Sequence, residues 1–266
     1  MATISDPAQQ DSTSERRGNA WGEHAAIADH PPVPDTRQPS WLELLPTPGS
    51  APHRAEPAPI ATHYSIIVVD IVGFGDLRRN NSSQLRVRRG LYDALQQSFD
   101  AAGVPWHRCR REDRGDGVLI LAPADVPKAL LVEQLPEKLA DALTTHNKRH
   151  PALEQIRLRL ALHAGEILED EHGVTSSSIT HTFRILEADV VKTTFTESAG
   201  VLAVIGSLWF FEEVIRQSDW SEAHTYVPLD VSHKETETRA WMRVVGRPRA
   251  RRRESTPLQR RLRRSK

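Results

Sequence analysis

The chain contains a single cysteine, Cys109, among 266 residues. No disulfide can form within the chain, which excludes a disulfide-stapled scaffold and indicates a reducing compartment. The N-terminus lacks the basic and then apolar layout of a signal peptide. The longest apolar run, residues 201–211, is much shorter than the ~20 residues that a membrane-spanning helix needs. The sequence therefore predicts a cytoplasmic protein.

Proline and charge are unevenly distributed, and both ends of the chain differ from its centre. Ten of the 18 prolines lie in residues 1–62, which show no sustained helical or strand period. Residues 247–266 contain ten Lys or Arg and one acid, a net charge of +9, in a chain whose formal net charge is zero. We expect a disordered tail over 1–62, one folded domain over 63–246 and a disordered basic tail over 247–266. The basic tail either contacts nucleic acid or another anionic surface, or serves only as a solvated tail.

The most informative segment is residues 66–75, IIVVDIVGFG. Four apolar residues lead to Asp70, and the segment ends in the turn Gly73-Phe74-Gly75. A run of this kind predicts a strand buried on both faces, in which an acid is costly unless a cation meets it. The glycine turn lets backbone N–H groups approach an anion at the start of a following helix. The segment taken alone fits a metal–polyphosphate site and a purely structural strand end about equally well.

A second acid favours the metal site. Asp116 lies in the segment 112–117, EDRGDG, which is followed by an apolar strand-like run. The pattern predicts a tight turn that holds Asp116 at the rim of the sheet. Two carboxylates on adjacent strands repel each other unless cations lie between them, and a pair of divalent ions resolves that repulsion.

Hydrophobic periodicity predicts the remaining elements. The predicted helices are 83–102, 126–150, 177–188 and 208–216, and the predicted strands are 106–111 paired with 118–121, 156–162, 200–205, 224–231 and 238–245. In the strand 156–162, Arg157 and Arg159 alternate with apolar residues, which predicts one solvent-exposed face. Helices interleaved with strands and hairpins indicate an α+β sandwich of the ferredoxin-like, split βαβ kind.

Four segments follow one another in the order and spacing found in class III nucleotidyl cyclases: VVDIVGFG, RGDG, RLRLALHAGEI (157–167) and GVTSSSITHTFRILEA (173–188). The sequence resembles this family over residues 63–245. The resemblance implies the α+β fold of the cyclase catalytic domain. It also implies a reaction in which the 3′-hydroxyl of a nucleoside triphosphate attacks its own α-phosphorus, giving a 3′,5′-cyclic nucleotide and pyrophosphate, with two Mg²⁺ or Mn²⁺ ions per site.

The resemblance also assigns roles to particular residues. Asp70 and Asp116 match the two metal-binding acids, with the carbonyl of Ile71 beside them, and Gly73, Phe74 and Gly75 match the phosphate-binding turn. A helix of the partner subunit carries an Asn and, four residues later, an Arg that stabilises the transition state. Arg184 matches the Arg, whereas Thr180 replaces the Asn. Activity is therefore expected from a homodimer.

Two positions of the resemblance concern the base of the nucleotide. Glu112 lies where adenine-selective relatives have Lys and guanine-selective relatives have Glu, and the position that is normally Asp for adenine falls near Gly173. The chain also resembles the pyrimidine cyclases of anti-phage, Pycsar-type systems, which would make cyclic UMP or cyclic CMP for a separate effector that binds the cyclic nucleotide. Glu112 reads as a base-contacting residue or as an outward-facing hairpin acid.

Three kinds of function remain open at this stage. The first is an active nucleotidyl cyclase for a pyrimidine, guanine or adenine nucleotide. The second is a catalytically degenerate module of the same fold that binds without turnover. The third is a nucleic-acid-associated adaptor that acts through the basic residues 247–266.

Overall fold

The computed structural model describes residues 60–246, which form an eight-stranded sheet with helices on both faces. Most of the predicted N-terminal tail and all of the predicted basic tail lie outside these residues, and so does the proposed contact of that tail with nucleic acid. The strands are β1 (Thr62–Ile71), β2 (Arg110–Asp113), β3 (Gly117–Pro123), β4 (Leu158–Asp170), β5 (Gly173–Thr175), β6 (Leu202–Ser207), β7 (Val227–His233) and β8 (Thr236–Val245).

Helices and short helical turns connect these strands. The α-helices are α1 (Asn81–Ala101), α2 (Ala129–Glu133), α3 (Leu135–Arg149), α4 (Ser177–Glu187), α5 (Asp189–Thr196) and α6 (Leu208–Phe210). The 3₁₀ turns are η2 (Trp106–Arg108), η3 (Ala152–Glu154) and η5 (Ala223–Thr225), and a π-helical turn, η4 (Phe211–Ile215), continues α6.

Strand β1 lies inside the sheet, as its apolar run predicts. The strand order is β2-β3-β1-β4-β6-β8-β7, with β5 paired to the end of β4. All neighbours are antiparallel except β4 and β6. The side chains of Ile66 to Val69 are at most 1% exposed, which confirms a strand buried on both faces. Burying each such side chain contributes about 2 kcal/mol.

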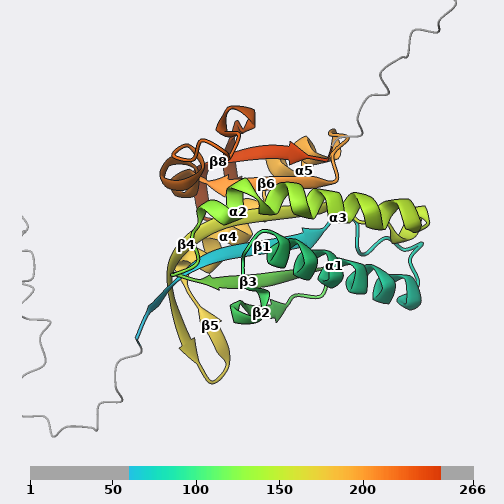
Figure 1. Ribbon diagram of the computed structural model, residues 1–266, viewed down its shortest axis with the longest axis horizontal. Helices are drawn as coiled ribbons and strands as arrows, with labels where there is room; N and C mark the ends of the chain where they lie inside the picture. The colour runs from blue at the N-terminus through green and yellow to red at the C-terminus, as the bar shows by residue number, and fades with distance from the viewer. Residues whose placement is uncertain (1–59, 247–266) are drawn as a thin grey trace, which may run out of the picture. The chain divides into compact units, whose positions relative to one another are not determined.

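The sheet separates two helical layers. Helices α1 and α3 lie side by side on one face, and α4 covers the other (Figure 1). Alternation along β1 sends Ile67, Val69 and Ile71 toward the α1 and α3 layer, and Ile66 and Val68 toward the α4 and α5 layer. Asp70 continues the second series, so its side chain belongs to the α4 and α5 face.

The predicted helices are largely confirmed, with two differences. The predicted helix 126–150 is divided at Gln134 into α2 and α3, because Pro136 occupies the first turn of α3, where a missing N–H is tolerated. The predicted helix 208–216 is a short α-helix followed by a π-helical turn. Helix α5, which follows α4 after Ala188, was not predicted.

The predicted strands are confirmed with shifted ends at both edges of the sheet. Trp106 does not lie in the predicted hairpin but in the turn η2, where its ring packs edge-on against Phe99 at 5.1 Å. At the other edge, His224 belongs to η5 and β7 begins only at Val227.

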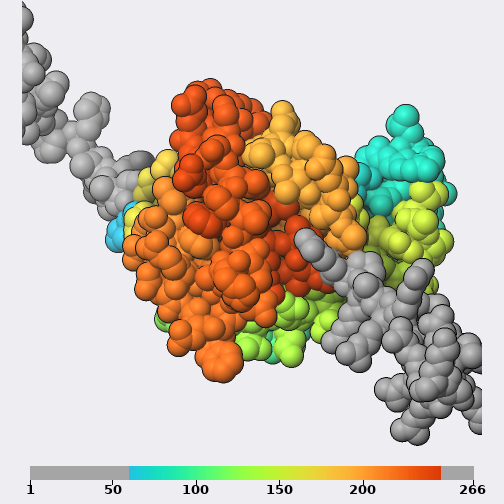
Figure 2. All heavy atoms as spheres, turned by 90° about the horizontal axis from the view of Figure 1, so that it is seen from above, coloured from blue at the N-terminus to red at the C-terminus, as the bar shows by residue number. Residues whose placement is uncertain are grey.

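In the space-filling view, the later elements, in orange and red, lie toward one end of the described domain, and the segment before α1, in teal, lies toward the other end (Figure 2). Within residues 60–246, no helix combines the length and the apolar character that a membrane span requires.

Candidate functional site

The two predicted acids lie at the same rim of the sheet. Asp70 on β1 is directly opposite Gly117 on β3, so Asp116 immediately precedes the residue that pairs with Asp70. The backbone carbonyl of Asp116 accepts a hydrogen bond of 2.9 Å from the N–H of Ile71. Asp116 is exposed, whereas the side chain of Asp70 is only 18% exposed. Burial is the main cause that raises the pKa of Asp70, and the negative charge of Asp116 adds to that rise.

Glycine at position 117 makes this arrangement sterically feasible. A Cβ added there would lie 2.0 Å from the carbonyl oxygen of Val69 and 3.1 Å from the Cα of Asp70. The turn before it uses Gly115 at φ +83°, a conformation that side chains rarely adopt. Glycine is therefore needed where β3 approaches β1 beside the acids.

Asp113, in the same hairpin, faces away from this rim. Its carboxylate accepts hydrogen bonds from Arg88 and from the hydroxyl of Tyr92, both at 2.7 Å, and one of 2.8 Å from the N–H of Gly115. The ion pair with Arg88 is the main cause that lowers the pKa of Asp113 to about 2. Asp113 is thus a structural acid of the hairpin that ties β2 to α1.

Asp70 is already paired with an arginine. Arg159 on β4 is directly opposite Asp70 and forms a bidentate ion pair with its carboxylate. Its Nε donates to Oδ1 at 2.9 Å, and its Nη2 donates to Oδ2. Burial raises the pKa of Asp70 above its ordinary value, and the hydrogen bond from Arg159 opposes that rise. This bidentate, charge-assisted pair is the strongest polar contact that Asp70 makes.

The prediction that Arg157 and Arg159 form a solvent-exposed face is wrong. The side chain of Arg159 is only 10% exposed. Arg157 lies before β4, and its guanidinium donates to the carbonyls of Phe195, Ser198 and Gly200 at the end of α5. Both arginines meet oxygen acceptors inside the protein, because helix α5 covers this part of the sheet.

The oxygen donors at this rim fit a hard divalent cation. Carboxylates from Asp70 and Asp116 and the carbonyl of Ile71 are the ligand types that Mg²⁺ and Mn²⁺ prefer, with water completing the coordination. Residues 60–246 contain no cluster of three or more His, Cys, Asp or Glu that could hold a metal by side chains alone. A metal at this rim would therefore depend on both acids and on backbone and water oxygens.

The predicted phosphate-binding turn follows β1 directly. Gly73 adopts φ +68°, and the N–H of Phe74 donates back to the carbonyl of Ile71 at 3.3 Å. The ring of Phe74 packs against the α1 and α3 core. Within the described part of the chain, the N–H groups of Gly73 and Gly75 donate no hydrogen bond. Two of the three N–H groups in the turn are therefore available to an anion, and that of Phe74 is already used.

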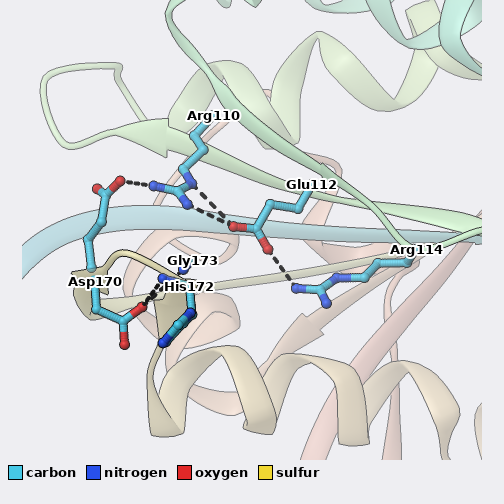
Figure 3. A network of polar contacts seen from close by, with 7 residues as sticks. Arg110, Glu112, Arg114, Asp170, His172 and Gly173 are labelled. Carbon is cyan, nitrogen blue, oxygen red and sulfur yellow. Dashed lines mark hydrogen bonds and ion pairs between the residues drawn. The ribbon is translucent and has the colours of Figure 1, made fainter.

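Glu112 belongs to a row of alternating charges across β2 and the arm formed by β4 and β5 (Figure 3). Its Oε1 accepts from Nε and Nη2 of Arg110 at 3.2 and 3.0 Å, and its Oε2 accepts from Arg114 at 2.8 Å. Arg110 also pairs with Glu169. A Cβ on Gly173 would lie 3.7 Å from Oε1 of Glu112, so the fold brings the two predicted base positions together. Glu112 is therefore an ion-paired acid of the β2–β3 hairpin with a side chain that is 24% exposed, and its role as a base-contacting residue stays a prediction.

Thr180 and Arg184 lie one turn apart on α4 and line the same cavity of about 540 Å³, together with His163, Ser177, Ser178, His181 and Thr236. Arg184 donates to the hydroxyl of Thr236 at 3.1 Å and forms an ion pair with Glu235 in the turn between β7 and β8. Among residues 60–246, neither Thr180 nor Arg184 makes a hydrogen bond or ion pair with Asp70 or Asp116. Within the described residues, each half of the predicted site thus has its own set of polar contacts.

The structure adds two features to the predicted site. Arg159 was visible only as an alternating arginine, and its pairing with Asp70 depends on the β1–β4 register. The second feature is the packing of His163 between Ser207, whose hydroxyl lies 2.8 Å from Nδ1, and the rings of His181 and Trp209. Burial lowers the pKa of His163 to about 4, so the imidazole is neutral at physiological pH.

Comparison with solved structures identifies the fold. The guanylyl cyclase Cya2 aligns with 73% of this chain and 97% of its own chain, at 16% identity and a TM-score of 0.52. A bacterial light-regulated adenylyl cyclase aligns with 70% of this chain and 51% of its own, at 13% identity and a TM-score of 0.50. No protein-family model matches the sequence, and no curated protein matches it either. Residues 60–246 therefore have the α+β fold of guanylyl and adenylyl cyclase catalytic domains.

Proposed function

We propose that this chain, which has a cyclase catalytic fold, converts a nucleoside triphosphate into a 3′,5′-cyclic nucleotide and pyrophosphate. The observation that supports the proposal most is that Asp116 immediately precedes the residue opposite Asp70 at one rim of the sheet, and that β1 continues there into a turn in which the N–H groups of Gly73 and Gly75 are free within residues 60–246. Carboxylates and a phosphate-binding turn in one place are what a metal–triphosphate complex requires.

In the proposed reaction the ribose 3′-oxygen forms a bond to the α-phosphorus. The bond from that phosphorus to the bridging oxygen of the β-phosphate breaks, and the hydroxyl proton passes to solvent. Asp70, Asp116 and the carbonyl of Ile71 would hold Mg²⁺ or Mn²⁺, which on binding favours ionisation of the hydroxyl and neutralises charge on the leaving pyrophosphate. The N–H groups of Gly73 and Gly75 orient the phosphates.

Arg184 and Thr180 complete the site from a second copy of the chain. The guanidinium of Arg184 stabilises negative charge that builds up on the phosphoryl oxygens, and the hydroxyl of Thr180 orients the ribose. The proposal of a homodimer rests on the resemblance to cyclases in which a helix of the partner subunit supplies these two residues, and it agrees with the absence of a hydrogen bond or ion pair from either residue to Asp70 or Asp116 within residues 60–246. A composite site of this kind requires a symmetric interface.

A pyrimidine nucleotide is the proposed substrate. Recognition of guanine by a carboxylate needs both carboxylate oxygens, one for the ring N–H and one for the exocyclic amine. Both lone pairs of Oε1 of Glu112 are directed at Arg110, which leaves Oε2 to accept one further bond. Gly173 offers no side chain to read the far edge of a purine. A uracil or cytosine edge needs only one acceptor, with donors supplied by Arg114.

The experiment is an incubation of the purified chain with Mn²⁺ and each of the four nucleoside triphosphates, with products identified by mass spectrometry. We expect a cyclic product, most rapidly from UTP or CTP, and its loss in Asp70→Ala and in Asp116→Ala. Faster turnover of GTP or ATP would reject only the base assignment. If no triphosphate yields a cyclic product, the cyclase proposal is wrong.

A binding module without turnover is a second candidate, and the Arg159–Asp70 ion pair favours it, because that pair occupies one proposed metal ligand. Nucleotide binding without cyclic product in the same experiment would support this candidate. As an active enzyme, the chain is proposed to signal in anti-phage defence of the Pycsar type through a separate effector that binds the cyclic nucleotide. Loss of phage protection in cells that carry Asp70→Ala is the matching test.

A further inference from the structure

One ion pair at the rim has no role in the proposed reaction. Arg159 and Asp70 are directly opposite each other on β4 and β1, and both side chains are largely buried, at 10% and 18% exposure. Within residues 60–246, Asp70 is the only side chain to which the guanidinium of Arg159 donates. The pair therefore links β1 to β4 at the rim.

The electrostatics of the rim explain why a cation is needed there. Asp70 is removed from water, and the charge of Asp116 lies nearby, so an ionised Asp70 without a partner would be costly. Arg159 supplies one positive charge at hydrogen-bond distance from both oxygens of Asp70. The positive charge of Lys192 on α5 adds a weaker effect of the same sign. The protein thus carries its own counter-ion at the acid that the proposed metal would use.

A guanidinium and a divalent cation cannot share this carboxylate without a cost. Arg159 takes one lone pair on each of Oδ1 and Oδ2, and two positive groups within a few ångströms repel each other in a partly buried site. Binding of a metal at Asp70 therefore works against the charge of Arg159, whether or not its hydrogen bonds to Asp70 break.

We propose that Arg159 competes with the divalent cation for Asp70 and so sets the metal affinity of the site. The inference rests on the proposed metal site at Asp70 and Asp116 and goes beyond it by assigning Arg159 as a positioning residue that weakens metal binding. The wild-type chain then binds metal weakly, because the metal must bind against the positive charge of the guanidinium.

The test is equilibrium binding of Mn²⁺ alone to the full chain at pH 8, followed by the electron paramagnetic resonance signal of free Mn²⁺. The variants are Arg159→Gln, which removes the competing charge, and Arg159→Lys, which keeps the charge but loses the two-point grip. Arg157→Gln is the matched control, because Arg157 lies on the same face and donates to backbone carbonyls rather than to Asp70. Thermal melting identifies any variant that fails to fold.

We expect Arg159→Gln to bind Mn²⁺ at least about 10-fold more tightly than the wild type, Arg159→Lys to bind a few-fold more tightly, and Arg157→Gln to bind as the wild type does. Equal or weaker binding by a folded Arg159→Gln overturns the inference. Should Arg159→Gln not fold, unchanged binding by Arg159→Lys overturns it instead. If no form binds Mn²⁺, Arg159→Gln included, the metal site and the proposed function fail together.

Discussion

The two halves of the proposed site differ in how the protein holds their charged groups. Asp70 lies within the central strand, and its partner Arg159 is 10% exposed on the adjacent strand. Arg184 projects from helix α4, and its partner Glu235 is 77% exposed in a turn. The first half is fixed by strand register and by the close approach at Gly117, whereas the second is held by a surface ion pair. Changes in the first half should therefore alter both stability and function, and changes in the second should alter function alone.

The largest effect is expected from Arg184→Ala. If its guanidinium stabilises the transition state, the turnover number should fall by about 10²- to 10³-fold. The melting temperature should stay close to that of the wild type, because the only ion pair lost is with an exposed acid. Steady-state kinetics and thermal melting measure the two quantities on the same sample. A turnover number within a few-fold of the wild type would remove Arg184 from the mechanism.

Mixing two inactive variants tests whether the halves come from different chains. Asp70→Ala and Arg184→Ala are each expected to be inactive, but a heterodimer of the two contains one intact site. Random exchange of subunits should restore about a quarter of the wild-type activity. Arg184→Ala mixed with itself is the control. Absence of recovery, with subunit exchange verified by native mass spectrometry, would place both halves in one chain.

Gly117→Ala tests whether the close approach of β3 to β1 holds the half of the site at Asp70 and Asp116 in place. The added methyl group would lie 2.0 Å from the carbonyl oxygen of Val69, so β3 must move away from β1. We expect the free energy of unfolding to fall by about 2 kcal/mol or more. Urea denaturation measures this change, and Gly75→Ala, where a Cβ meets no atom within 4 Å, is the matched control. Equal stability of the two variants would show that the rim tolerates a wider strand spacing.

The sequence predicts the half of the site at Asp70 and Asp116 better than the half on α4. The apolar run before Asp70 and the glycines around Asp116 carry local signals for a buried strand and a tight turn, and the structure has both. The partner of Asp70 could not be predicted in this way, because Arg159 is 89 residues away and only the β1–β4 register brings them together. Alternation of apolar and polar residues along a strand shows which side chains share a face of the sheet, but it does not show which helix covers that face.

The same reasoning explains what was missed at α4. Its amphipathic pattern predicted the helix, but the contact of Arg184 with Glu235 spans 51 residues and depends on a turn with Lys234 at φ 52°. Nothing local to α4 indicates that the β7–β8 turn reaches back to it.

A pH dependence distinguishes the cavity beside α4 from the rim at Asp70. Burial, aided by His181, lowers the pKa of His163 from its ordinary 6.5 to about 4. The unfolded chain therefore takes up this proton first as the pH falls, so the protein should lose stability progressively from pH 6.5 toward pH 4. His163→Asn, which retains a polar partner for Ser207, should flatten that part of the stability profile. Denaturation midpoints between pH 7 and pH 4.5 measure it, and His172→Asn at an exposed position should leave it unchanged.

The smallest effect is expected from Glu235→Gln. The carboxylate is exposed, so the ion pair with Arg184 should contribute less than about 1 kcal/mol to stability. Because Arg184 is then free of that ion pair, the turnover number of Glu235→Gln should be at least that of the wild type. A loss of stability well above that limit, measured by urea denaturation, would show that the half of the site on α4 is held as firmly as the half at Asp70.

The proposed reaction requires Asp70 and Asp116 to bind the same divalent cations. The most direct test of this requirement is equilibrium Mn²⁺ binding to Asp70→Asn and to Asp116→Asn, each compared with the wild type and checked for folding by thermal melting. Each single substitution is predicted to weaken binding at least about 10-fold, because each removes one anionic oxygen ligand. Wild-type Mn²⁺ affinity in either folded variant would contradict a shared metal site.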